Sequence, residues 1–413
     1  MSETLAVLVG GGPAPGINGV IAAAAMEAFN CGLRVVGIYD GYRDLAAGRA
    51  PSTVELTFDH VSRIHTAGGS ILRTSRTNPA RDDATLDRCT ASLLSLGPRY
   101  LVCIGGDDTT FGAAKIAERV QGRIGVASVP KTIDNDLPLP DNAPTFGFET
   151  ARSIGAGILE SLMEDARTTV RWYIVVCMGR KSGALALGMC KAAGSTLAVL
   201  PEEFADGVGL GDIIDTIVGA VVKRRSVGRQ HGVAVVAEGV VERLRPDALA
   251  AVHGVARDSF GNIALADVPL ATILRDGTRE RLREVGVAST VHAKDIGYEL
   301  RCAKPVPFDV DYTRTLGFGA VRYLVEGGSG ALIALRGGHL EPIALDDLLD
   351  PNTGRIRTRL VDTTTEGYHV ARDYMVRLEP LDFSDERRLA ALAAQTNLSP
   401  PEFRAAFERV ALP

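Results

Sequence analysis

The 413-residue chain has a single tryptophan and only 5% aromatic residues, and several patterns that define classes of protein are missing from it. With 45 basic and 50 acidic side chains its net charge is -5, so it has no broad basic surface for nucleic acid or an anionic membrane. Its most apolar stretches, 20–29 and 233–241, fall short of the roughly 20 residues that span a bilayer. The N-terminus carries no basic segment or small-residue cleavage site, so we expect a cytoplasmic protein that binds neither nucleic acid nor membrane.

Cysteine is also scarce, and its spacing excludes the common metal and redox motifs. There is no C-x-x-C pair among the six cysteines, which fall in apolar segments at Cys31, Cys89, Cys103, Cys177, Cys190 and Cys302. We therefore expect buried thiols rather than zinc ligands or disulfides. The 46% hydrophobic and 23% charged residues are, in contrast, typical of a folded protein, and the length is sufficient for two or more domains.

Short apolar runs alternate with helix-like stretches along most of the chain. Residues 5–9 form an apolar run, a Gly/Pro turn follows, 17–29 is alanine-rich and helix-like, and 34–39 has the pattern of the next strand. Further strand-like runs occur at 100–104, 124–129, 172–178, 197–200 and 233–238. This alternation predicts an α/β protein with parallel sheets.

Two later segments bear on domain organisation. Three prolines within residues 137–144 exclude a helix and suit a crossover, so we expect a domain boundary there. Beyond Gly338 the sequence becomes mixed, with many turn residues between 346 and 365. It ends in two expected helices, 384–395 and 400–412, which we interpret as packing elements rather than as parts of a site.

Three polar loops each follow one of the expected strands. The first, Gly10-Gly-Gly-Pro-Ala-Pro-Gly16, precedes a helix, and its backbone amides and the positive helix N-terminus suit a phosphate. A tight strand-to-helix turn explains the same glycines equally well. The second loop, 105–110, contains Asp107 and Asp108, whose carboxylates suit Mg²⁺, although Asp and Thr are also common helix N-caps.

The third loop carries the strongest signal. It places Lys131, Thr132, Asp134 and Asp136 together, directly after an expected strand. A cation, a hydroxyl and two carboxylates can stabilise a phosphoryl group, accept a proton from an alcohol and bind a metal. Turn formation explains Asn135 and Asp136 but not the whole set. Because parallel sheets bind ligands at the carboxyl ends of their strands, the three loops together predict one site.

These motifs resemble those of the phosphofructokinase family, and the likeness extends from the first strand to about Leu335. The family's glycine turn matches residues 11–16, its metal loop matches 105–109, and its catalytic loop matches 132–136. The resemblance implies an α/β fold of two Rossmann-like parallel-sheet domains, with the active site in the cleft between them.

On the donor side, the resemblance implies a role for several residues of these loops. Asp134 would be the base that takes the proton from the 1-hydroxyl of the sugar. Asp107 would bind Mg²⁺ with the help of Asp136. Gly12 would meet the phosphates of the donor, and Arg76 would lie near the phosphate that is transferred.

The identity of the donor depends on Asp108 and Lys131, which we count with Asp134 as catalytic residues. Members of the family that use ATP usually have glycine at both positions, whereas the pyrophosphate-using branch is similar to this sequence in having Asp and Lys. A carboxylate at Asp108 would repel the α-phosphate of a nucleotide, and Lys131 would neutralise a donor that has no nucleoside. The resemblance therefore implies pyrophosphate as the donor.

The acceptor side also matches the family. The implied substrate-binding residues are Thr132, Asp134, Met178, Gly179, Arg180, Glu238, Tyr298 and Arg301, together with Arg171, whose counterpart is often lent across a subunit interface. Without the resemblance, Met178 and Glu238 suit packing in a core and Arg301 suits a solvated surface charge. Asp44 and Arg73 stand where many members have glycine. The resemblance also implies a homodimer or homotetramer.

As a whole, the resemblance implies a reversible phosphorylation of fructose 6-phosphate at O1 by pyrophosphate, in glycolysis or gluconeogenesis. Residues 1–146 and 305–413 would form a donor domain with a C-terminal extension, and 147–304 would form a sugar-phosphate domain. Three alternatives stay open: ATP as the donor, sedoheptulose 7-phosphate as the acceptor, and a non-catalytic regulatory or sugar-phosphate-binding protein. The presence of Asp107 and Asp134 argues against the last of these.

Overall fold

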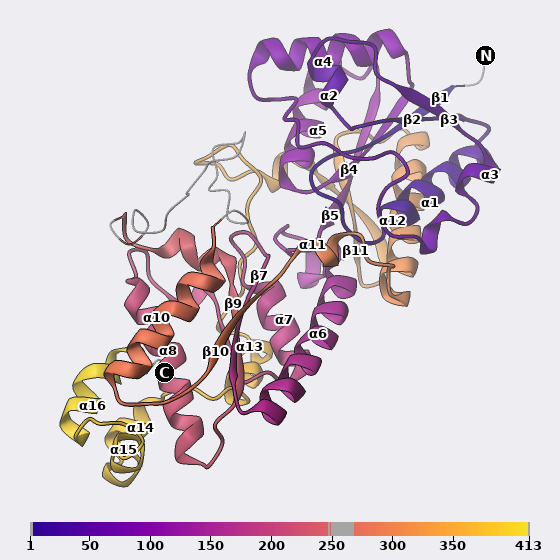
Figure 1. Cartoon of the computed structure of the whole chain (residues 1–413). Helices are drawn as coiled ribbons and strands as arrows, with labels where there is room; N and C mark the ends of the chain where they lie inside the picture. Colours follow the sequence, from indigo (N-terminus) through magenta and orange to yellow (C-terminus); the bar gives the residue numbers. More distant parts are fainter. Residues whose placement is uncertain (1–2, 247, 249–267, 412–413) are drawn as a thin grey trace. The chain divides into compact units, whose positions relative to one another are not determined.

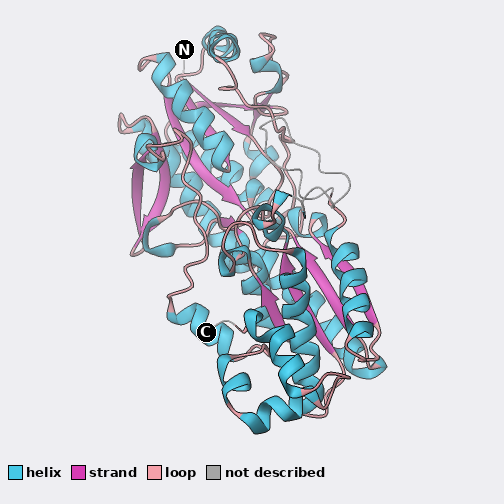
Figure 2. Ribbon diagram, turned by 90° about the vertical axis from the view of Figure 1, so that its left-hand side faces the viewer, coloured by secondary structure: helices cyan, strands magenta, loops and turns pink. Residues whose placement is uncertain are grey.

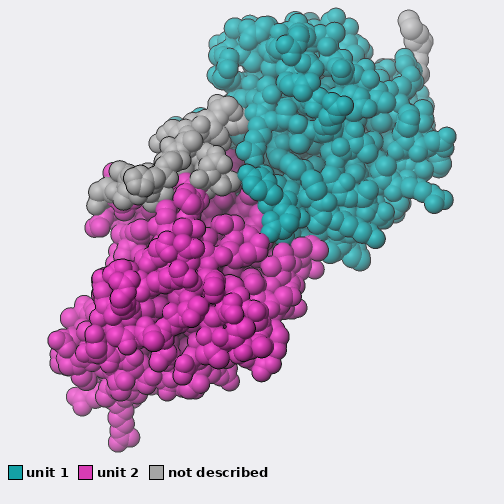
Figure 3. Space-filling view, in the orientation of Figure 1, with its two compact units in different colours: residues 1–151, 298–359 teal, residues 152–297, 360–413 magenta. Residues whose placement is uncertain are grey.

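Figure 1 shows the computed structural model of the chain, which describes residues 3–246, 248 and 268–411. It divides into two compact units, drawn in different colours in Figure 3. Unit 1 comprises Met1–Ala151 and Tyr298–Arg359, and unit 2 comprises Arg152–Gly297 and Leu360–Pro413. The chain first passes from one unit to the other shortly after the proline-rich segment. The segment from Leu360 onward, which the sequence interpretation joins to the donor domain, packs within unit 2.

Unit 1 is built around an eight-stranded sheet. Along this sheet the strands follow the order β12-β11-β5-β4-β1-β2-β3, and the short β6 pairs with β5. Their bounds are β1 Thr4–Val9, β2 Arg34–Ile38, β3 Thr53–Leu56, β4 Tyr100–Gly105, β5 Gly125–Thr132, β6 Phe146–Gly147, β11 Ala331–Arg336 and β12 His339–Ala344. The edge strands β3 and β12 are antiparallel to their neighbours, whereas β2, β1, β4, β5 and β11 are parallel. The expected parallel sheet is thus confirmed, with an antiparallel strand added at each edge.

Helices cover both faces of this sheet, as Figure 2 shows. Leu5, Val7 and Val9 of β1 lie in one core with α1 and α12, and Ala6 and Leu8 lie in a second core with α4 and α5. Burial of both faces explains why the strand is an uninterrupted apolar run. The helices of unit 1 are α1 Ile17–Asn30, α2 Arg43–Ala46, α3 Phe58–Val61, α4 Asp83–Leu96, α5 Asp107–Val120, α11 Tyr298–Arg301 and α12 Pro307–Val325.

Unit 2 contains a four-stranded sheet in which all strands are parallel. Its order is β10-β7-β9-β8, with bounds β7 Trp172–Cys177, β8 Leu197–Val199, β9 Gly232–Ala237 and β10 Val291–Ile296. Figure 1 shows α8 and α10 on one side of this sheet and α7 on the other. The helices are α6 Phe148–Thr169, which begins in unit 1, α7 Ala184–Ala193, α8 Leu210–Ser226, α10 Leu270–Glu284, α13 Glu366–Asp373, α14 Pro380–Ser384, α15 Glu386–Ala393 and α16 Pro400–Phe407.

The loops that the sequence singles out follow the carboxyl ends of neighbouring parallel strands. In unit 1, Gly10 follows β1, Gly106 follows β4 and Ile133 follows β5, and these three strands are adjacent in the sheet. In unit 2, Met178 follows β7 and Glu238 follows the adjacent β9. Each sheet therefore brings its own polar loops together at one edge.

Two expectations from composition can be compared with the structure. None of the described helices is both long and apolar enough to cross a bilayer. All six cysteines are free thiols. Cys302 is exposed and Cys31 is part-buried, whereas the other four are buried as expected.

Candidate active site

The glycine turn after β1 is held by its neighbours in unit 1. The amide of Gly10 donates to the carbonyl of Ile104 at 2.9 Å, and the amide of Gly11 donates to the carbonyl of Ser75 at 2.9 Å. Gly11 has φ of 81°, in the left-handed region that favours glycine. Because two of its amides already have protein acceptors, the turn offers an anion fewer backbone donors than its sequence implies.

Thr109, in the first turn of α5, packs against glycines of two different loops. A Cβ atom at Gly10 would lie 2.4 Å from Thr109 Oγ1, and one at Gly105 would lie 2.2 Å from Thr109 Cβ. Both distances are far below van der Waals contact, so both positions require glycine as long as Thr109 is present. The contact holds the glycine turn and the expected metal loop close together.

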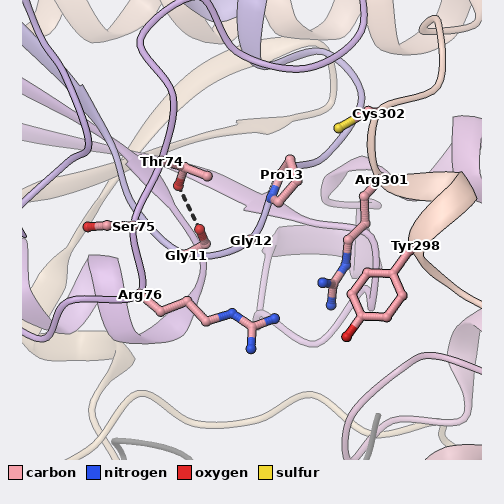
Figure 4. A pocket seen from close by; sticks show the side chains of 9 residues that line it. All are labelled: Gly11, Gly12, Pro13, Thr74, Ser75, Arg76, Tyr298, Arg301 and Cys302. Carbon is pink, nitrogen blue, oxygen red and sulfur yellow. Dashed lines mark hydrogen bonds between the residues drawn. The ribbon is translucent and has the colours of Figure 1, made fainter. Parts of the chain in front are cut away.

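A cavity of about 390 Å³ opens beside the glycine turn, and Figure 4 shows the side chains that line it. Arg76 and Arg301 extend into it from different segments of unit 1. A Cβ atom at Gly12 would lie 3.6 Å from Arg301 Cζ and 3.8 Å from Arg76 Nη2, so both guanidinium groups face this glycine. The Arg301 guanidinium also lies over the ring of Tyr298, 5.0 Å from its centroid. Two converging cations make the cavity suitable for an anion.

This cavity unites residues that the sequence interpretation assigns to different substrates. Gly12 and Arg76 are predicted to bind the phosphoryl donor, whereas Tyr298 and Arg301 are predicted to bind the sugar phosphate. In the structure all four line the same cavity of unit 1.

Lys131 adds a third cation next to the glycine turn. It lies in β5, is buried, and its Nζ donates to the carbonyl of Gly12 at 2.6 Å. Burial lowers the pKa of its ammonium group to about 8, and the charge of Arg301 adds to this shift. Three nearby carboxylates oppose the shift, the largest effect first: Asp134, Asp107 and Asp136.

The catalytic loop of the sequence interpretation begins at the last residue of β5. The hydroxyl oxygen of Thr132 accepts the amide of Asp134 at 3.0 Å, and the carbonyl of Thr132 accepts Thr145 Oγ1 at 2.7 Å. Asn135 has φ of 57°, a left-handed conformation that Asn tolerates better than most residues. Asp134 and Asp136 are both buried. Thr132 therefore fixes the backbone from which Asp134 projects.

Asp107 and Asp108 lie in the first turn of α5, and the N-cap residue is Gly106. Neither Asp107 nor Asp108 is therefore the N-cap residue of α5. The partial positive charge at the helix N-terminus favours carboxylates at both positions.

The chemistry of these carboxylates fits Mg²⁺. Asp107 and Asp136 come from neighbouring loops, and both act electrostatically on Lys131. Within the part of the chain that the structure describes, no group of three or more His, Cys, Asp or Glu side chains could hold a metal by itself. Mg²⁺ usually binds to one or two carboxylates together with phosphates of the substrate, so a pair of carboxylates beside a cationic cavity is a suitable donor set.

In unit 2, Glu238 holds the loop that follows β7. Its Oε1 accepts the amide of Gly179 at 3.1 Å and the amide of Arg180 at 2.9 Å. Arg180 has φ of 52°, and a Cβ atom at Gly239 would lie 2.3 Å from its carbonyl oxygen. Glu238 is buried but is not simply a core acid, because it determines the conformation of the predicted sugar-phosphate loop.

Met178 lies at the start of the same loop and is buried. Its amide donates to the carbonyl of Ile296 at 3.0 Å, and a Cβ atom at Gly297 would lie 3.0 Å from Met178 Cε. These contacts describe a packing residue at the edge of the loop. Within unit 2, Met178, Gly179, Arg180 and Glu238 thus lie together, as the sequence interpretation expects.

Arg171 is not part of this group within unit 2. It precedes β7, whereas Met178 follows β7, and a strand of six residues is about 20 Å long. The Nε of Arg171 lies 3.8 Å from Asp165 Oδ2 at the end of α6. Within one copy of unit 2, Arg171 and the loop after β7 are therefore at opposite ends of a strand.

Two residues that contact these loops are missing from the sequence interpretation. Glu202 Oε1 accepts the amide of Gly183 at 2.8 Å, just beyond the loop after β7. Arg359 donates to the loop after β5 through its guanidinium group. Asp107 is a candidate because it is a carboxylate that closely follows a strand. Glu202 closely follows β8, so the same criterion would have found it. No local pattern marks Arg359, which lies in a segment of turn residues.

Comparisons with known proteins agree on one family. The profile of a family described as phosphofructokinase matches residues 4–324. The chain is 50% identical over 409 residues to the pyrophosphate–fructose 6-phosphate 1-phosphotransferase of Thermotoga maritima, covering 98% of this chain and 98% of that protein. It is 48% identical over 410 residues to a protein of the same name from Naegleria fowleri, covering 97% of this chain and 94% of the relative.

The fold is also found among solved structures. The crystal structure of a pyrophosphate-dependent phosphofructokinase from Nitrosospira multiformis superposes with a TM-score of 0.68 at 17% sequence identity, and the match covers 91% of each chain. At this level of identity the similarity concerns the fold of the chain.

Proposed function

The chain belongs to the phosphofructokinase family, and on this premise we propose that it transfers a phosphoryl group from pyrophosphate to O1 of fructose 6-phosphate. The products are fructose 1,6-bisphosphate and phosphate, and the reaction is reversible. The names of the two relatives described above agree with this donor and this acceptor. Unit 1 would bind the donor and unit 2 would contribute the loop for the sugar phosphate.

The observation that carries this proposal is the convergence of three cations on Gly12. The guanidinium groups of Arg76 and Arg301 face this glycine, and Lys131 donates to its carbonyl. Pyrophosphate has no nucleoside to bury, so its binding energy must come from contacts to its phosphates. Asp108, on the neighbouring helix, adds a negative charge that disfavours the larger polyanion ATP.

In the proposed reaction Asp134 accepts the proton of the 1-hydroxyl group. O1 forms a bond to one phosphorus atom of the donor, the bond from that phosphorus to the bridging oxygen breaks, and inorganic phosphate leaves. Arg76 stabilises the charge on the oxygens of the transferred group, and Arg301, which is assigned to the sugar phosphate, lines the same cavity. Thr132 contributes by holding the amide of Asp134, so that the base keeps its position.

We assign Mg²⁺ to Asp107 and Asp136. When bound, the ion neutralises negative charge on the donor oxygens. Both carboxylates act electrostatically on Lys131, which contacts the glycine turn, and this supports the assignment.

Glu238 is proposed to hold a hydroxyl group of the sugar in addition to its own loop. Its Oε1 accepts the amides of Gly179 and Arg180, so this carboxylate, a hydrogen-bond acceptor, lies directly at the predicted sugar-phosphate loop. The position of Arg171, one strand length from this loop, supports a role in a second copy of the chain. We therefore propose a homo-oligomer in which Arg171 serves the sugar-phosphate site of a neighbour.

The test is a set of initial rates on the purified protein with Mg²⁺ and fructose 6-phosphate, with pyrophosphate or ATP as the donor. We expect turnover with pyrophosphate and little with ATP. Sedoheptulose 7-phosphate is assayed in parallel as the acceptor. Turnover with ATP alone would contradict the donor assignment, and absence of turnover with every pair of substrates would contradict the proposed enzyme.

A double variant tests the donor assignment at the level of residues. Asp108→Gly with Lys131→Gly removes the two side chains that distinguish the donors. We expect the rate with pyrophosphate to fall and the ratio of the ATP rate to the pyrophosphate rate to rise. An unchanged ratio would show that these side chains do not select the donor.

A further inference from the structure

Arg359, the last residue of unit 1 before the chain enters unit 2, makes three hydrogen bonds to the catalytic loop and a fourth to Ala143, beyond the loop. Its Nε donates to the carbonyl of Asn135 at 2.9 Å, and its Nη1 donates to the carbonyl of Ala143 at 2.8 Å. Its Nη2 donates to the side-chain oxygen of Asn135. Its backbone amide donates to the carbonyl of Asp136 at 2.7 Å.

These contacts fix the loop at Asn135, where its backbone conformation is unusual. Asn135 adopts a left-handed conformation, and its side-chain oxygen also accepts the amide of Thr145 at 3.0 Å. The segment from Asn135 to Ala143 contains Pro138 and Pro140, which have no amide hydrogen to donate to a neighbouring backbone. The carbonyls at both ends of this segment instead receive hydrogen bonds from one guanidinium group.

The surroundings of Arg359 support the same interpretation. Its side chain is part-buried, and its guanidinium group donates to oxygens of Asn135 and Ala143. Removing a charged guanidinium group from water costs free energy unless its donors form hydrogen bonds. In Arg359 the hydrogen bonds that offset this cost are made to oxygens of the loop segment. The planar fork of arginine suits two carbonyls that have to be held at a fixed separation.

We propose that Arg359 is a positioning residue of the catalytic loop, holding Asp134 and Asp136 in place through the backbone of Asn135. This inference rests on the proposed function, in which Asp134 is the base. It also gives a role to a segment beyond residue 324, where the match to the family profile ends. Arg359 does not touch the reacting atoms and acts only through the loop.

The first experiment compares steady-state kinetics of the wild type with those of Arg359→Ala and Arg359→Lys. Misplacement of the base by about 1 Å costs on the order of 100-fold, so we expect kcat to fall by about 100-fold in Arg359→Ala. The KM for pyrophosphate should change by less than about 3-fold, because the donor cations of the cavity are untouched. Arg359→Lys keeps a positive charge but not the planar guanidinium fork, so its kcat should lie between those of the wild type and of Arg359→Ala.

Two controls separate positioning from a general loss of structure. Arg355→Ala removes an exposed arginine four positions earlier in the chain and should keep the kcat of the wild type. Added guanidinium ion, but not ammonium ion, should restore part of the kcat of Arg359→Ala by occupying the space of the lost fork. A kcat of Arg359→Ala within 2-fold of the wild type would overturn the proposal.

A second measurement does not depend on turnover. Hydrogen exchange of the amides in residues 133–137 should be about 10-fold faster in Arg359→Ala than in the wild type and in Arg355→Ala. Absence of pyrophosphate-dependent turnover in the wild type would refute the proposed function, and the exchange rates would still test the role of Arg359. Equal exchange in all three proteins would refute that role, whatever the activity.

Discussion

The two units hold their polar loops with side chains of opposite charge. In unit 1, Lys131 donates to the carbonyl of Gly12 and Arg359 donates to the carbonyl of Asn135. In unit 2, Glu238 and Glu202 instead accept backbone amides of the loop after β7 and of the residue that ends it. The groups that hold each loop also determine whether donors or acceptors lie beside a ligand.

Lys131 has three N–H donors, so an ammonium group that holds one carbonyl can also donate to an anion. The carboxylate of Glu238 lies at the loop after β7, and a carboxylate is an acceptor for hydroxyl groups. Unit 1 is therefore suited to bind phosphates, and unit 2 is suited to bind a molecule with hydroxyl donors. This difference agrees with pyrophosphate as the ligand of unit 1 and a sugar phosphate as the ligand of the loop in unit 2.

The largest effect is expected at the proposed base of unit 1. Asp134→Asn keeps the shape of the side chain but cannot accept the proton of the 1-hydroxyl group, so kcat should fall by about 10³–10⁴-fold. Binding of fructose 6-phosphate, measured by calorimetry, should persist. A kcat within 10-fold of the wild type would remove Asp134 as the base.

The next largest effect is expected at Lys131, the buried lysine of unit 1. Lys131→Met keeps the length of the side chain but loses its charge, and the KM for pyrophosphate should rise by about 100-fold, as for a buried charged contact. The KM for fructose 6-phosphate should change much less. Lys115→Met is the matched control, because Lys115 pairs with Glu118 on the outer side of α5. Equal changes in both KM values would show that Lys131 does not serve the donor selectively.

A pair of substitutions at Glu238 separates the two roles of the carboxylate in unit 2. Glu238→Gln keeps an oxygen for the amides of Gly179 and Arg180 but weakens the bond to a sugar hydroxyl, so the KM for fructose 6-phosphate should rise about 10-fold. Glu238→Ala also releases the loop and should raise it about 100-fold. If both variants had the same KM, one of the two roles would be absent. Glu280→Gln, on the surface of α10, is the control.

The smallest effect is a pH dependence in which stability and the affinity for anions change in opposite directions. Lys131 has a pKa of about 8 in the folded chain, and an unfolded lysine titrates near about 10.4. Between these values the unfolded state binds more protons, so the contribution of Lys131 to stability rises with pH, while the affinity of the donor site for anions falls. Urea midpoints and inhibition by sulfate, whose charge is constant in this range, should show both trends in the difference between the wild type and Lys131→Met measured at each pH.

Most of the fold follows from apolar runs in the sequence. The run at 100–104 becomes β4, and the run at 172–178 becomes β7, because a strand buried on both faces has no polar interruption. β3 and β12 are not expected, since edge strands face solvent and carry mixed residues. β11 is not expected either, although it lies inside the sheet and its first four residues are buried.

From the residues alone, the site could be predicted only where its members are close in sequence, and more distant members such as Arg76 and Glu238 are predicted only through the resemblance to a family. Lys131, Thr132 and Asp134 form a recognisable set because they occupy a single loop. Arg359 contacts Asn135 from 224 positions away, and a contact of this kind has no signature in a single sequence. Tyr298 and Arg301 are also predicted through that resemblance, and the structure adds that they line the same cavity as Gly12 and Arg76.

The packing of Thr109 against Gly10 and Gly105 constrains how this protein can evolve. A first mutation of either glycine to a larger residue clashes with Thr109, so it would be eliminated before it could be combined with another change. Only a prior change of residue 109 to glycine opens a path on which both glycines can vary, because a Cβ atom at Gly105 would lie 2.2 Å from the Cβ of Thr109 itself. One threonine thus determines the order in which substitutions can accumulate at two loops, and these three positions should change together among distant descendants of this chain.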